Sequence, residues 1–235
     1  MRYLPGLKLG IPCLNAESGL KLSGIYGINL LMLNPGQFSK IHIPYDKVLL
    51  RLGHARGRTM LDERTASLIQ EEISLCEKLA APKQVIASSK IVISGNSTVN
   101  LEPGLIINSA KIVELLANCS TAYGFAVTAG PHIEEKIKRL IFEKETSKAL
   151  ILDAIGSVIA EELAEITNKQ ITAEAKLNGF NTTRRFSPGY GDWHISGQKD
   201  FLRWLGADNI GIKLNDNFQM TPEKSVSALL GLYKE

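Results

Sequence analysis

The feature that most constrains the fold is one long helical stretch, residues 147–168, SKALILDAIGSVIAEELAEITN, which is apolar almost all round at its start. A helix with apolar side chains on every side must be surrounded by other elements, because water is an unfavourable environment for that surface. We therefore expect this stretch to be the central, most buried helix. Its acidic end should be partly solvated, with Glu161 and Glu162 near water.

Asp153 lies in the apolar part of that stretch. Burying an ionised carboxylate is costly unless the group is paired or hydrogen-bonded. Two interpretations stay open: Asp153 lies at the helix edge or caps neighbouring backbone, or it meets a partner arginine or a ligand. Gly156 would allow another backbone to approach closely, at a cost of about 1 kcal/mol relative to alanine.

The rest of the chain mixes strand and helix patterns in irregular order. Period-two or buried apolar runs bounded by turn residues predict strands; they cover residues 41–53 (a strand entering a loop), 83–95, 104–108, 122–130, 210–214 and the end of 218–233. Apolar residues at helical spacing predict helices at 59–82, 109–119, 132–145 and 195–206. This irregular alternation favours an α+β fold over a doubly wound sheet.

The 235 residues are enough for a substantial core, and 44% hydrophobic with 22% charged residues argue against a mainly disordered chain. Residues 1–40 are rich in Gly, Leu and Asn without a sustained period, so we expect a weakly ordered N-terminal extension before a domain at 41–235. A net charge of +3 without long basic runs disfavours nucleic-acid binding.

Several other classes lack their sequence signals. The uncharged stretch at 22–39 is interrupted by polar residues and glycines, which disfavours a membrane span or a secretory signal. Cys13, Cys76 and Cys119 are widely separated, so we expect a reduced, cytoplasmic protein without a cysteine-ligated metal. The four histidines are scattered without metal-ligand spacing, and neither a glycine-rich phosphate loop nor a Gly-x-Ser-x-Gly elbow occurs.

The chemistry that remains is concentrated in RRFSPGYGDW, residues 184–193. Pro188 fixes φ, and Gly189 permits a tight bend with bare backbone amides. Arg185 can hold a carboxylate by two hydrogen bonds, and Tyr190 or Trp193 can offer an aromatic face to a cation. A zwitterionic small ligand suits this set of groups, whereas the alternative is a surface turn with an aromatic plug.

Three segments resemble the activation domain of cobalamin-dependent methionine synthase, especially its stand-alone relatives, from residue 41 to the C-terminus. The segments are DAIGSVIAEELAE, RRFSPGYGDW and QMTPEKSVSALLGLY, with the markers Arg185-x-x-Pro188-Gly189-Tyr190 and Met220-x-Pro222-x-x-Ser225-Val226-Ser227. The resemblance implies an α+β fold with a twisted, mainly antiparallel sheet and packed helices.

The resemblance also implies an S-adenosylmethionine site. Arg185 would bind the methionyl carboxylate, the backbone at Ser187 and Gly189 would meet the ligand beside Pro188, and Tyr190 would line the pocket. Asp153 is a further candidate for this site. After Tyr190 the chain continues Gly191-Asp192-Trp193 instead of the Pro-Ala-Cys-Pro of the fused enzymes, and Ser157 replaces an acidic residue that some of them carry.

In that family the domain serves repair of an oxidised corrinoid. An electron from flavodoxin or a ferredoxin, with a methyl group from S-adenosylmethionine, restores methylcobalamin. The resemblance thus implies an accessory protein for methionine biosynthesis whose partner, a methionine synthase lacking its own activation domain, carries the cobalamin.

Two other functions stay open at this point. The chain could be a non-enzymatic docking module for a corrinoid protein, in which the loop only shapes a surface. It could also be a self-contained methyltransferase for a small molecule, which needs a general base near the loop; the local candidates are Asp192 and His194.

Overall fold

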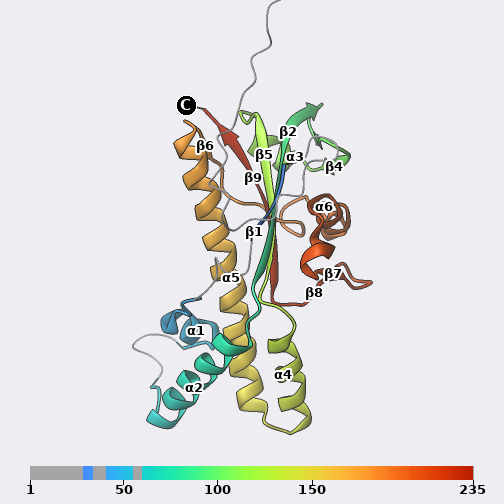
Figure 1. Cartoon of the computed structure of the whole chain (residues 1–235). Coiled ribbons are helices and arrows are strands. Elements are labelled where there is room, and N and C mark those ends of the chain that lie inside the picture. The colour runs from blue at the N-terminus through green and yellow to red at the C-terminus, as the bar shows by residue number, and fades with distance from the viewer. Residues whose placement is uncertain (1–28, 34–40, 55–59, 235) are drawn as a thin grey trace, which may run out of the picture.

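A computed structural model describes residues 29–33, 41–54 and 60–234 of the chain. Figure 1 shows a sheet between two layers, with the long helix α5 on one side and α6 with the short β7 and β8 strands on the other. The elements in chain order are β1 (Asn29–Leu33), α1 (Tyr45–Arg51), α2 (Glu63–Leu79), β2 (Lys83–Ser94), β3 (Thr98–Leu101), β4 (Leu105–Asn108), α3 (Ala110–Leu116), β5 (Thr121–Thr128), α4 (His132–Phe142), α5 (Thr146–Leu177), β6 (Asn181–Thr182), α6 (Gln198–Leu205), β7 (Lys213–Leu214), β8 (Met220–Thr221) and β9 (Ser225–Tyr233).

The main sheet has seven strands in the order β4-β3-β2-β5-β9-β6, with β1 as a further partner of β2. Every pair in it is antiparallel. The long β2 strand pairs with β5 over residues 83–90, and its other side pairs with β1 over 84–88 and with β3 over 91–94. Helices mixed with an antiparallel sheet confirm the predicted α+β class.

Strand alternation gives the sheet two buried faces. On β5, Phe125 and Val127 pack with the core beneath α1, α2, α4 and α5, whereas Ala122 and Ala126 pack with the core beneath α3 and α6. Where both faces are covered, the central strands β5 and β9 are buried on both sides, whereas β3 and β4 alternate between buried and more exposed residues.

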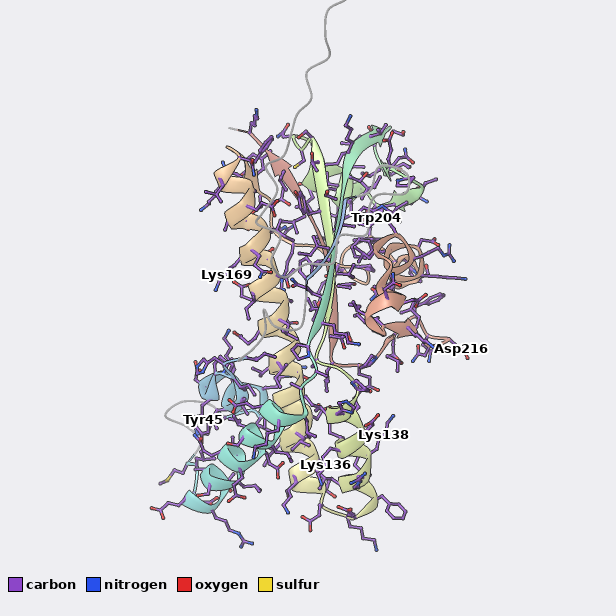
Figure 2. All side chains as sticks on the ribbon, viewed as in Figure 1. Tyr45, Lys136, Lys138, Lys169, Trp204 and Asp216 are labelled. Atoms are coloured by element: carbon purple, nitrogen blue, oxygen red, sulfur yellow. The ribbon has the colours of Figure 1, made fainter. Side chains whose placement is uncertain are left out.

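The face under α6 is tightly packed at Gly124 in β5. A Cβ atom at Gly124 would lie 2.5 Å from the Trp204 ring and 3.0 Å from the Phe201 ring. Trp204 extends from α6 toward the sheet (Figure 2), and its ring stacks on Phe201 with centroids 5.9 Å apart. The absence of a side chain at Gly124 therefore allows α6 to approach the sheet.

Helix α5 is the central helix that the sequence predicts, but it is longer. The prediction ended at Asn168, whereas the helix continues to Leu177. The buried residues Thr167, Ile171 and Ala175 follow one another at four-residue spacing, so one face keeps its contacts with the core although its neighbours are polar. The chain leaves the helix at Gly179, where φ is +75°.

The predicted strand at residues 41–53 is wrong, since the structure has helix α1 there. Pro44 precedes the helix with a φ of −68°, and its carbonyl accepts hydrogen bonds from the amides of Lys47 and Val48. Pro44 is the N-cap residue, with an extended ψ of 116°, so its missing amide lies just outside the helix and costs no intrahelical hydrogen bond. The buried Val48 anchors the helix on the core.

The predicted extension at residues 1–40 lies outside the described residues except for 29–33, which form β1. The sequence patterns also missed β3, a four-residue strand between two turns. In the described part of the chain, no helix combines the length and the apolar character that a membrane crossing requires.

Candidate functional site

A cavity of about 470 Å³ lies beside the loop that follows β6. This volume is in the range of small-ligand sites. The cavity is lined by one residue of α5, the loop, the start of α6, the β7–β8 turn and the start of β9: Glu161, Arg184, Arg185, Phe186, Ser187, Pro188, Tyr190, Ile195, Gln198, Phe218, Gln219, Met220, Ser225, Val226 and Ser227. Segments from the middle and the end of the chain thus meet at one site.

The bend at Gly189 is fixed by its own backbone geometry. Gly189 has a φ of +92°, which favours glycine, and its amide donates to the Trp193 carbonyl at 2.8 Å. A Cβ atom there would also lie 3.1 Å from Cδ1 of Ile195, which lines the cavity. The positive φ therefore favours glycine at this position, and a larger side chain would also have to displace the end of Ile195.

Two of the aromatic residues of the loop, Trp193 and Tyr190, have different environments. Trp193 is buried and meets Phe201 edge-on, with ring centroids 5.3 Å apart, so its faces belong to the core. Tyr190 is 68% exposed and lines the cavity. Trp193 thus fills the core, as the surface-turn alternative expected of an aromatic residue, whereas Tyr190 offers a surface to the cavity.

The first half of the loop is attached to β9. The amides and carbonyls of Phe186 and Leu229 exchange two hydrogen bonds of 2.8 Å. The Ser187 hydroxyl donates to the Ser227 carbonyl at 2.6 Å. These contacts fix one wall of the cavity relative to the sheet.

The second half of the loop is attached to helix α3 through Asp192. Its carboxylate accepts hydrogen bonds from the Ser109 hydroxyl, the Ala110 amide at 2.7 Å and the Lys111 amide at 3.3 Å. The Ser109 hydroxyl, followed by these amides, holds the pKa of Asp192 below its usual value. Asp192 therefore binds the start of α3 and is not among the residues that line the cavity.

Arg185 brings a partly used guanidinium to the cavity. Its Nη2 donates to Oε2 of Glu161 at 2.8 Å, whereas its Nη1 is buried without a hydrogen-bond partner among the described residues. The Ser227 hydroxyl is likewise buried without a partner in the described chain. Because leaving a buried donor unsatisfied costs about 1 to 3 kcal/mol, a ligand that satisfies both atoms would recover stability.

Asp153 has a different environment. Its carboxylate accepts a hydrogen bond of 2.6 Å from Lys224 Nζ, which also donates to the Ser157 hydroxyl at 3.1 Å. The partner is thus a lysine, not the arginine that the sequence left open, and Asp153 does not line the cavity. At Gly156 the close neighbours are the Lys224 and Ile133 side chains and not another backbone.

The structure brings Arg185, Ser187, Pro188 and Tyr190 to one cavity, with Gly189 in the same bend. Sequence reasoning missed Glu161, Gln198 and Phe218 as lining residues. The sequence singled out Glu161 only as a partly solvated residue of the helix and gave no signal that it reaches the loop. For Phe218, which has a φ of +60° in the β7–β8 turn, the sequence carries no such signal.

Known proteins resemble this chain in sequence and in fold. The family model described as "Vitamin B12 dependent methionine synthase, activation domain" matches residues 116–235. A solved structure titled "Crystal Structure of the MetH Reactivation Domain bound to AdoHcy" is similar with a TM-score of 0.65 at 15% identity, covering 88% of this chain and 78% of that one. Among curated proteins, no match was found.

Proposed function

The chain belongs to the activation-domain family of vitamin B12 dependent methionine synthase, and from this premise we propose that it binds S-adenosylmethionine for reductive reactivation of a corrinoid cofactor. The partner would be a cobalamin-binding methionine synthase. The single observation that carries the proposal is the buried Nη1 of Arg185, which has no partner among the described residues and belongs to a side chain that lines the cavity.

The residues present fit the proposed ligand. Arg185 would bind the α-carboxylate through Nη1 while Nη2 stays on Glu161, because one guanidinium can serve two acceptors. The Ser227 hydroxyl supplies a second free polar group. The apolar parts of Phe186, Ile195 and Phe218 offer surfaces for the nucleoside portion.

The structural neighbour supports the same ligand class. Its title states that it binds AdoHcy, which is S-adenosylmethionine without the transferable methyl group. When bound, S-adenosylmethionine supplies an activated methyl group. The role of this chain would be to hold the ligand's amino-acid end against Arg185 and to exclude water with the loop around the buried Pro188.

The corrinoid would be held by the partner, outside this domain. Tyr190, at 68% exposure, would lie where the bound partner approaches the cavity. The electron needed for reactivation would come from flavodoxin or a ferredoxin, as the family resemblance implies.

The two alternative functions, a docking module and a self-contained methyltransferase, make different demands on the site. A docking module would bind the corrinoid protein with no dependence on S-adenosylmethionine. A self-contained methyltransferase needs a general base at the ligand, but the Asp192 carboxylate is engaged by α3 and the His194 ring by Ser196. Neither residue lines the cavity, which disfavours that alternative.

Isothermal titration with S-adenosylmethionine tests the proposal. We expect saturable binding to the wild-type protein and a loss of about a hundredfold in Arg185→Ala, because a charge-assisted contact is removed. Arg203→Ala is the matched control, since Arg203 pairs with Asp200 on α6 and does not line this cavity. A folded wild-type protein that gives no saturable binding would disprove the ligand assignment, and the docking module would then be the better-supported function.

A further inference from the structure

We propose that a second, smaller cavity between helix α6 and strand β7 binds a small organic anion, that is, a carboxylate or phosphate group attached to an apolar body. The cavity has a volume of about 190 Å³. None of the described residues that line it also lines the larger cavity beside Arg185. The inference therefore goes beyond the proposed function and does not rest on it.

The shape of the smaller cavity is fixed by local contacts. After α6 the chain forms a short 3₁₀ turn, Ala207–Ile210, and the Ile212 amide then donates to the Ala207 carbonyl at 3.2 Å. The chain thus returns to α6, so that this helix and β7 line the same cavity, on the side of the sheet opposite α5 (Figure 1). Leu202 and Ile212 are 6% and 1% exposed, so they anchor this wall in the packed core.

The inner surface of the smaller cavity is apolar. Leu202 and Ile212 contribute buried side chains, and Leu214 of β7 contributes a half-buried one. An apolar cavity of about 150 Å³ is large enough to hold benzene. One small ring or branched aliphatic group would therefore fill this space, and its burial would supply the part of the binding energy that does not depend on charge.

The outer surface of the smaller cavity carries mainly positive charge. Lys199 and Arg203 of α6 and Lys213 of β7 line it with exposed side chains, and Asp208 is the one carboxylate among its described lining residues. Lys199 and Lys213 form no ion pair with a described residue, whereas Arg203 pairs with Asp200. An anion bound here would be attracted by cations from two elements and would offset their mutual repulsion.

The two surfaces together select the ligand class. An inorganic anion would leave the apolar interior in contact with water, and a neutral apolar molecule would leave the cations without a partner. A molecule that carries an anionic group on a small apolar body satisfies both surfaces at once.

Isothermal titration with phenyl phosphate, inorganic phosphate and phenol tests the inference, because only phenyl phosphate combines the ring with the anionic group. We expect saturable binding of phenyl phosphate to the wild type with a Kd of about 1 mM or lower, at least about tenfold tighter than either other probe. Absence of saturable binding below about 10 mM would overturn the inference. Equal affinities for phenyl phosphate and inorganic phosphate would overturn it too, because the apolar interior would then be unused.

Charge-neutral variants determine where the anion binds. Lys199→Gln and Lys213→Gln should each weaken phenyl phosphate binding about threefold, and about tenfold together, because each removes one exposed cation. Lys169→Gln is the matched control, since Lys169 is an exposed lysine that extends from α5 away from the sheet (Figure 2). It should leave the affinity unchanged, and an equal loss in all three variants would contradict a site between α6 and β7.

The Arg185 guanidinium can attract the same anion at the larger cavity, so Arg185→Ala is titrated as well. We expect its affinity for phenyl phosphate to stay within about twofold of the wild-type value. Loss of binding in Arg185→Ala, with no effect of the two lysine variants, would place the anion in the larger cavity and overturn the inference without contradicting the proposed function. A wild-type protein that binds phenyl phosphate through Lys199 and Lys213 but does not bind S-adenosylmethionine would support this inference and disprove the proposed function.

Discussion

Two of the ion pairs that helix α5 makes differ in how completely their cations are satisfied. The Lys224 ammonium is 8% exposed in its side chain and donates to both Asp153 and Ser157. The Arg185 side chain is 31% exposed, donates to Glu161, and keeps Nη1 without a partner in the described chain. The first pair ties the β8–β9 turn to the helix, whereas the second leaves one guanidinium nitrogen without a partner among the described residues.

The difference shows how one helix serves both the fold and the site. A buried cation with all its partners supplied by the protein is part of the structure, since removing one partner leaves an uncompensated charge. A buried donor with no partner is a cost that the fold tolerates, and ligand binding can offset it. Substitutions in the Asp153–Lys224 pair should therefore mainly lower the stability of the protein. Substitutions of Arg185 should mainly weaken ligand binding.

The largest effect on stability is expected at the satisfied pair. Lys224→Ala removes a buried side-chain stem that packs against Gly156 and should lower the free energy of unfolding by about 2 to 3 kcal/mol, most of it from the stem because Asp153 is 51% exposed and water replaces its partner. Urea unfolding followed by circular dichroism measures the change. Lys224→Met keeps the stem and should recover most of the loss. An alanine variant as stable as the wild type would show that this pair does not hold the turn.

A smaller effect on stability is expected at the pair beside the cavity. Arg185→Ala should change the free energy of unfolding by less than about 1 kcal/mol, because Glu161 is 55% exposed and water replaces its partner. The same urea experiment measures it. A loss as large as that of Lys224→Ala would contradict the comparison, because Arg185 would then be a structural residue as well.

The smallest effect concerns a third carboxylate, Asp192, which fastens the loop to α3. Its pKa is lowered in the folded state, first by the Ser109 hydroxyl, so its stabilising contribution is complete above the unfolded-state pKa of about 3.9 and is lost as the pH falls through the folded-state pKa. Asp192→Asn should therefore be less stable than the wild type near neutral pH, and the difference should shrink toward about pH 3.

Urea unfolding of both proteins across that pH range measures this difference. Asp216→Asn is the matched control, because Asp216 lies exposed in the loop between β7 and β8, away from the sheet (Figure 2). A difference between Asp192→Asn and the wild type that stays constant down to acid pH would mean that the Asp192 charge does not hold the loop.

Much of the fold could be predicted from periodicity. The start of α3 at Ser109 was predicted from its capping side chain, which accepts from the Ile112 amide. The buried run of β5 and the amphipathic α6 follow from local patterns as well. The prediction of a strand at 41–53 failed because Ile41 and Ile43 alternate as in a strand, whereas Pro44 is the N-cap residue of a helix that begins at Tyr45.

The candidate site could be predicted in part. The motif from Arg185 to Tyr190 is contiguous in sequence, so its turn chemistry and its resemblance to the family could be recognised from the sequence alone. The opposite walls of the cavity could not be predicted, because Glu161 and Phe218 reach it from separate elements. The ligand roles of Arg185, Ser187, Pro188, Gly189, Tyr190 and Asp153 remain predictions that the titrations above would test.

The sequence by itself determined a buried central helix and a proline-glycine loop that carries an arginine, because each depends on residues that are near one another in the chain, and three such segments together indicated the family. Only the tertiary structure decided that Asp153 pairs with Lys224, 71 residues away, and that Glu161 reaches Arg185, 24 residues away. Local patterns cannot specify such partners, since the packing of β9 and the loop against α5 determines which carboxylate meets which cation.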